Sequence, residues 1–166
     1  MKAKTFLTIV LTLATAAYAG EKRAFTIADH FRVVGVADPQ VSPDGTWVAY
    51  VTNHTDLERG KRWSHIWLVP TAGGTPRQLT QGEFANSSPA FSPDGKFLAF
   101  VSNREDKTPQ VYLLPLAGGE PRKLTSFPGG VGDPIWHPSG KFLAVTAQVY
   151  PECGANVECH KKIAEG

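Results

Sequence analysis

The sequence predicts an all-β fold, a partial β-propeller of four-stranded antiparallel blades with about two and a half blades present. Three copies of one turn sequence indicate this: Ser42-Pro43-Asp44-Gly45, Ser92-Pro93-Asp94-Gly95 and His137-Pro138-Ser139-Gly140. Their final glycines are 50 and 45 residues apart, an interval typical of one propeller blade. Four short strand-like runs also follow one another in the same order within each complete repeat.

The recurring turn contains the residue types that a tight turn requires. Proline pre-sets φ, aspartate bonds to nearby backbone groups, and glycine accepts a positive φ. Metal binding or acid/base chemistry is an alternative for Asp44 and Asp94, but their identical place in a repeat favours a structural role. We expect valine to be tolerated better at Gly82, outside the turns, than at Gly45 or Gly95. The structural turn residues are Pro43, Asp44, Gly45, Pro93, Asp94, Gly95, Pro138 and Gly140.

The second strand of each repeat is apolar on both faces, whereas a half-exposed strand would alternate. Neighbouring blades are therefore expected to cover both faces, with Trp47, Trp67 and Trp136 in the core between blades. Polar loops are expected at 53–63 and 103–108. Proline at the start of each fourth strand is typical of an outer edge. The predicted second, third and fourth strands are 47–51, 97–101 and 142–145, then 65–69 and 110–114, then 76–80 and 121–125.

The chain divides into four parts. A signal peptide (1–19) precedes an N-terminal segment with a short helix (20–36), the propeller repeats (37–149) and a cysteine-bearing insert with a helical end (150–166). Thr26 and Asp29 have the spacing of a capping box at the start of the expected N-terminal helix. The third blade is incomplete, because neither a Gly-Gly turn nor a fourth-strand sequence follows Tyr150. The blades are about 37–82, 87–127 and 132–149.

The N-terminus is typical of an exported protein. Lys2 and Lys4 precede an apolar stretch, and Ala17-Tyr18-Ala19 supplies small residues for cleavage between Ala19 and Gly20. An uncleaved membrane anchor is the alternative, but the stretch is shorter than the ~20 residues that span a bilayer. The sequence therefore predicts a secreted or periplasmic protein.

Composition excludes several classes of partner. The chain has 166 residues, 42% of them hydrophobic, and a net charge of +2. Its lysines and arginines are scattered, so there is no basic stripe for nucleic acid and no basic amphipathic helix for a membrane surface. We expect no nucleic-acid partner and, after signal cleavage, no membrane partner.

The two cysteines, Cys153 and Cys159, both lie in the insert. An even number in an exported chain predicts a disulfide. Zinc binding with the adjacent His160 is the alternative, but two thiols and one histidine lack the fourth ligand of a structural zinc site.

The repeat resembles the TolB-type, WD-like propeller repeat. Residues 38–50, preceded by Phe25-Thr26-Ile27-Ala28-Asp29, are similar to the opening of secreted prolyl-oligopeptidase-family serine peptidases of the dipeptidyl- or acylaminoacyl-peptidase type. The segments 150–153 and 159–162 resemble a cysteine-bearing insert in a bacterial branch of that family. The resemblance implies a C-terminal α/β-hydrolase domain carrying serine, aspartate and histidine, with a propeller that restricts access of peptide substrates.

The sequence lacks catalytic machinery of its own. It contains no G-x-S-x-G nucleophile elbow, and no catalytic, cofactor-binding or metal-binding residue and no cofactor is assigned. We therefore interpret the chain as an N-terminal propeller fragment whose partners are the missing C-terminal blades and hydrolase domain. Two alternatives are a TolB-like periplasmic module that binds proteins without catalysis, and a short structural protein that completes its ring by oligomerising.

Overall fold

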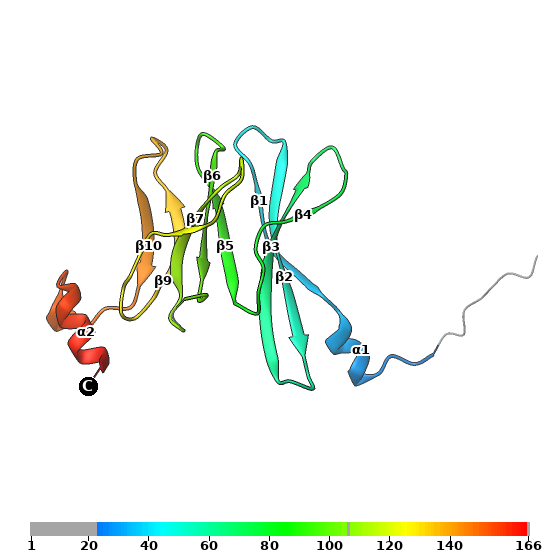
Figure 1. The fold of residues 1–166 in the computed structure, drawn as a ribbon, viewed down its shortest axis with the longest axis horizontal. Helices are drawn as coiled ribbons and strands as arrows, with labels where there is room; N and C mark the ends of the chain where they lie inside the picture. Colours follow the sequence, from blue (N-terminus) through cyan, green and yellow to red (C-terminus); the bar gives the residue numbers. More distant parts are fainter. Residues whose placement is uncertain (1–22, 106, 166) are drawn as a thin grey trace, which may run out of the picture.

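The computed structural model describes residues 23–105 and 107–165, and its sheets confirm the predicted fold class. Three antiparallel sheets stand side by side, one for each turn repeat (Figure 1). The first two have four strands in sequence order, and the third has two. The first sheet contains β1 (Gly35–Val41), β2 (Trp47–Asp56), β3 (Lys61–Pro70) and β4 (Arg77–Gln78).

The other two sheets repeat this arrangement. The second contains β5 (Asn86–Phe91), β6 (Phe97–Ser102), β7 (Gln110–Pro115) and β8 (Arg122–Lys123), and the third contains β9 (Val131–Trp136) and β10 (Leu143–Ala147). Helical segments flank the sheets: α1 (Ile27–Arg32), the 3-10 turn η1 (Pro151–Cys153) and α2 (Val157–Glu165). None of the helices in the described ranges is long and apolar enough to cross a membrane.

Helix α1 begins with a complete capping box. The backbone amide of Asp29 donates to the Thr26 side chain, and the Asp29 carboxylate accepts from the Thr26 amide at 2.9 Å. These bonds satisfy amides that the first helical turn leaves without partners.

The core lies between the blades. Side chains of β2 and β3 pack against one face of the second blade, and the other face of that blade packs against the third. Leu98 and Phe100 point to the first side, whereas Ala99 and Val101 point to the second, as strand alternation requires. The middle blade is therefore apolar on both faces because both are covered.

The predicted polar loop at 53–63 is wrong, because most of it is strand. Pairing of β2 with β3 continues through Asn53↔Ser64, His54↔Trp63, Thr55↔Arg62 and Asp56↔Lys61. In the second blade the pairing stops at Ser102↔Gln110. Cross-strand stacking and opposite-charge pairs stabilise such polar strands. Residues 53–64 therefore form a hairpin arm that projects past the end of the sheet (Figure 1).

The fourth strands are shorter than predicted, with two residues each. Pairing continues one residue further, where the Leu79 amide donates to the Ile66 carbonyl at 2.8 Å. The Ile66 amide then donates to the Thr80 hydroxyl at 2.9 Å, and Thr125 accepts from Val111 in the same way. A threonine side chain thus takes the place of a backbone carbonyl at the end of each outer strand.

The tryptophans occupy different environments from one another. Trp136 packs against the core between the second and third blades, and its Nε1 donates to the Ala90 carbonyl at 3.1 Å. Trp67 is half-buried on the open face of the first blade, and Trp47 is 37% exposed. The expectation of a core between blades is wrong for Trp47, whose side chain is at the strand end, and for Trp67, which belongs to neither core cluster.

Candidate functional site

The first two repeated turns are built from the same side-chain contacts. The Ser42 hydroxyl donates to the Asp44 carboxylate at 2.5 Å and accepts from the Trp47 amide at 2.9 Å. The Ser92 hydroxyl contacts Asp94 and Phe97 equivalently, at 2.6 and 2.9 Å. The bond from the serine hydroxyl, followed by one from the backbone amide of Thr46 or Lys96, holds the pKa of each aspartate below its ordinary value. The carboxylates therefore organise turns.

The third turn uses different side chains in the same backbone. His137 Nδ1 accepts from the Ser139 amide at 3.1 Å and lies 2.8 Å from the Ser139 hydroxyl. Nucleophilic catalysis also needs a group that orients the histidine. Within the described ranges no hydrogen bond joins His137 to a carboxylate, and the two residues share one exposed turn. This pair is a turn contact.

The first strands of the three blades line a shared groove. Its volume is about 500 Å³, and its walls include Asp38, Ser88, Asp133, Phe91 and Trp136. Carboxylates are among the residues that line it, and no histidine or cysteine is.

One position in this groove has the same unusual backbone in every blade. Asp38, Ser88 and Asp133 have φ values of 57°, 50° and 46°, and each precedes a proline. Such values are uncommon outside glycine. A bulge interrupts the strand pairing at each site. The Asp38 carboxylate accepts from the Ser88 amide at 2.9 Å, which joins the first blade to the second.

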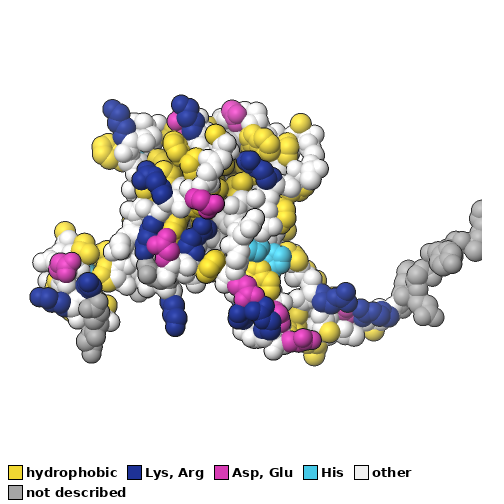
Figure 2. Space-filling model, in the orientation of Figure 1, with side chains coloured by type: hydrophobic (Ala, Val, Ile, Leu, Met, Phe, Trp, Pro, Cys, Tyr) yellow, Lys and Arg dark blue, Asp and Glu magenta, His cyan; other side chains and the backbone are white. Residues whose placement is uncertain are grey.

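The open face of the first blade carries a cluster of aromatic and histidine side chains. The rings of His54 and Trp63 are stacked at 5.6 Å, and His65 lies 5.4 Å from His54. The Thr52 hydroxyl accepts from Trp67 Nε1 at 3.0 Å and lies 2.9 Å from His54 Nε2. Burial, together with the neighbouring His54, lowers the pKa of His65. Figure 2 shows histidine side chains at the surface above the charged lower end of this blade.

Charged residues fix the tip of the hairpin arm. Glu83 accepts from Arg59 and, at 2.5 Å, from Lys61. The Arg59 guanidinium, aided by Lys61, lowers the pKa of Glu83 to about 2. At the base of the arm, the Ser64 hydroxyl donates to the Asn86 carbonyl at 2.6 Å. The arm is therefore held against the connection between the first two blades.

Arg104 is half-buried and makes contacts that the sequence does not predict. Its guanidinium lies 5.1 Å from the Phe100 ring centre and 5.0 Å from that of Tyr112. It donates to Asn86 Oδ1 and Ser102 Oγ, both at 3.2 Å. Burial lowers its pKa. The residue anchors the β6–β7 loop through cation–π contacts, and its position in an apparently polar loop gave no signal of this.

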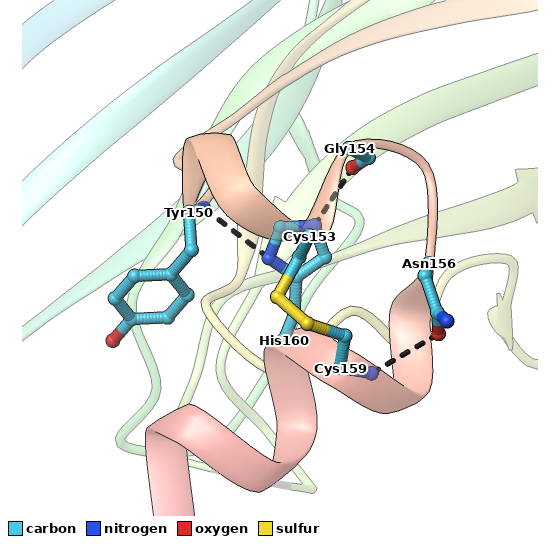
Figure 3. Close-up of a disulfide and its surroundings, with 6 residues drawn as sticks. All are labelled: Tyr150, Cys153, Gly154, Asn156, Cys159 and His160. Carbon is cyan, nitrogen blue, oxygen red and sulfur yellow. Dashed lines mark hydrogen bonds between the residues drawn. A yellow bond between two sulfur atoms is a disulfide. The ribbon is translucent and has the colours of Figure 1, made fainter.

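The insert is closed by a bond between Cys153 and Cys159 (Figure 3). Asn156 Oδ1 accepts from the Cys159 amide at 3.1 Å near the start of α2. A disulfide leaves no thiolate for zinc, and both His160 nitrogens have backbone partners. Across residues 23–105 and 107–165, no three histidine, cysteine or acidic side chains are grouped to hold a metal ion. The signal cleavage site, Ala19 and Gly20, lies outside the described residues.

Peptidases from a bacterium and from a fungus are similar to this chain in sequence. The uncharacterized peptidase YuxL of Bacillus subtilis is 41% identical over 90 residues, which cover 54% of this chain and 14% of YuxL. Dipeptidyl-peptidase 5 of Aspergillus fumigatus is 33% identical over 86 residues, or 43% of this chain and 12% of that protein. The matched segment is thus a small part of each relative.

Solved structures show the same fold. The acylaminoacyl peptidase of Pyrococcus horikoshii has a TM-score of 0.59 at 22% identity over 71% of this chain and 18% of that one. The β-propeller domain of the Trilobed protease from Pyrococcus furiosus has a TM-score of 0.55 at 22% identity, over 68% of this chain and 33% of that one. Residues 22–157 match the TolB beta propeller domain. The chain, with its repeated turns and stacked sheets, therefore belongs to the TolB β-propeller domain family.

Proposed function

We propose that this chain is the N-terminal propeller portion of an exported serine peptidase, in which the propeller restricts substrate access. The observation that carries the proposal is the 41% identity over 90 residues to a peptidase. That peptidase is far longer than the matched segment. The proposed partners are the remaining blades and an α/β-hydrolase domain, and the proposed substrates are short peptides.

The groove along β1, β5 and β9 supports the gating role. First strands that share one groove form the wall of a central passage when further blades complete a ring. The repeated bulges keep Asp38, Ser88 and Asp133 in that wall. A narrow passage admits short flexible peptides and excludes folded proteins.

The DNA sequence downstream of the codon for residue 166 provides the first test of this proposal. An open reading frame that continues into a G-x-S-x-G sequence followed by aspartate and histidine supports the peptidase. A stop codon with no hydrolase gene nearby favours the second candidate, a TolB-like periplasmic module that binds proteins, which the family membership also allows.

Activity provides the biochemical test. The 166-residue chain alone should not hydrolyse proline- or alanine-based chromogenic peptides, because it has no nucleophile elbow. The same propeller joined to its hydrolase domain should cleave short peptides but not folded proteins. Hydrolysis by the pure chain that is lost when one of its serines is mutated would overturn the assignment.

Export is supported by the leader sequence and by the disulfide, a bond that persists in oxidising compartments. The mature product is expected to begin at Gly20. N-terminal sequencing of the protein from the periplasm or medium checks this, and a product that retains residues 1–19 would contradict signal cleavage.

A further inference from the structure

The two junctions between blades use the same positions of the repeat. In the first junction, Leu98 of β6 belongs to one core cluster with Ala49 of the preceding blade. In the second junction, Leu143 of β10 packs against the cluster that contains Ala99. Each leucine comes three residues after its turn glycine, and each alanine comes four residues after its own. One face of a blade is therefore built to receive the alanine-bearing face of the blade before it.

In the described part of the chain, the receiving face of the first blade has no blade against it. Val36, which pairs with Thr52, is 69% exposed. Val131, at the same repeat position, is 5% exposed and belongs to the core of the second junction. Val48, the counterpart of Leu143, lies on the same face as Val36, because strand side chains alternate. This first-blade face is therefore apolar and accessible.

The third blade exposes the opposite, alanine-bearing face. Ala144 occupies the repeat position of Ala49 and Ala99, which are both 0% exposed, yet Ala144 is itself exposed. Ile135 pairs with Ala144 and is 64% exposed. The first and third blades lie at opposite ends of the row of sheets (Figure 1). The two uncovered faces are thus the two halves of one junction, and they lie at opposite ends of the molecule.

We propose that copies of this chain associate head to tail. The third-blade face of one copy, formed by Ile135 and Ala144, packs on the first-blade face of the next, formed by Val36 and Val48. This contact repeats the junction between neighbouring blades, which bury their faces against one another. Because the two faces differ, the interface is heterologous, and successive copies extend into rings or open chains. The inference does not rest on the peptidase assignment, and a further blade of a longer chain would compete for the first-blade face.

Sedimentation velocity of the mature chain at micromolar concentration tests this mode of association. Val36→Lys blocks the first-blade face and Ala144→Lys blocks the third-blade face, because either lysine would be an unpaired charge buried in the contact. Each variant alone should associate at least about tenfold more weakly than the unchanged chain. Mixed in equal amounts, the two variants should form a dimer with one copy of each and nothing larger, since each keeps the face that the other has lost.

Val149→Lys is the matched control. Val149 is 56% exposed and lies between β10 and the insert, outside both faces, so this variant should associate as the unchanged chain does. A monomeric unchanged chain, or a mixture of Val36→Lys and Ala144→Lys that stays monomeric, overturns the proposal. Dimers of Ala144→Lys alone would show that two first-blade faces pair with each other, which also overturns it. Circular dichroism of each variant checks that the sheets remain folded.

Discussion

At the residue scale, the backbone conformation at the tips of the repeated turns requires glycine. Gly45, Gly95 and Gly140 have φ values of 71°, 70° and 70°. A Cβ added at Gly45 or Gly95 would meet nothing within 4 Å. The requirement for glycine at these two positions is therefore conformational and not steric.

Gly95→Ala should lower the free energy of unfolding by about 1–2 kcal/mol, the cost of a left-handed conformation for a residue with a Cβ. Gly95→Asn should cost less, because asparagine is enriched in this region. Gly35→Ala is the control, since Gly35 is not in the left-handed region and its added Cβ makes an ordinary 3.7 Å contact. Urea unfolding measures all three, and equal losses for Gly95→Ala and Gly35→Ala would contradict the assignment.

The expected tolerance of Gly82 is wrong. Its φ is 88°, and an added Cβ would lie 2.4 Å from the Phe84 ring. Valine there meets both a conformational and a steric obstacle. The local sequence gave no indication of this contact, because it arises only when the loop after Gly82 places the Phe84 ring beside the glycine.

The turn aspartates make stability depend on pH. The Ser92 hydroxyl, followed by the Lys96 amide, lowers the pKa of Asp94 in the folded chain. This stabilisation is fully present above the ordinary aspartate pKa of about 3.9 and is lost as pH falls through the lowered folded value. Asp94→Asn should therefore reduce the urea midpoint at pH 7 and have a smaller effect at pH 2.5. The same reduction at both pH values would show that the charge is unimportant.

At the element scale, a threonine hydroxyl at the end of each outer strand accepts the hydrogen bond that a backbone carbonyl would otherwise accept. Thr80 is 2% exposed, and its hydroxyl is the acceptor for the Ile66 amide. Thr125 does the same for Val111. This explains why the outer strand keeps threonine at its end although only two of its residues pair as strand.

Thr80→Val should destabilise the chain by about 1–3 kcal/mol, because it leaves a buried amide without an acceptor while preserving shape. Thr75→Val is the matched control, at an exposed position just before the same strand. Thermal or urea unfolding compares the two. A loss for Thr80→Val no larger than for the control would remove the proposed role of the hydroxyl.

At the scale of the whole molecule, the middle blade is covered on both sides while the first blade has an open face. Val36 and Val41 are 69% and 62% exposed, beside the cluster formed by Thr52, His54 and Trp63. Propeller blades bury their faces against neighbours. We propose that another blade of the full-length protein covers this open face.

The mature chain should self-associate through this face. Light scattering at micromolar concentration should detect oligomers or aggregates, and Val36→Lys with Val41→Lys should reduce them by placing charge on an apolar sheet. Thr75→Lys, at an exposed position ahead of β4, is the control. A stable, cooperative monomer of the unchanged chain would show that it is a complete domain and would defeat the interpretation as a truncated propeller.

The sequence by itself determined the repeat, the turns and the all-β class, because these depend on residues within a few positions of one another. Turn chemistry at Pro43 to Gly45 and two-sided apolar strands are local signals. The family resemblance rests on the same local patterns, so it too could be predicted.

Only the tertiary structure decided the contacts between distant segments. Asp38 meets Ser88 across 50 residues, and Arg104 is covered by rings from two strands. His160 is buried because the insert folds back onto Phe127. The arm forms because His54 and Trp63 face each other once the strands pair. Each depends on which side chains the fold brings together, and polar residues carry no periodic signal that reveals their partners.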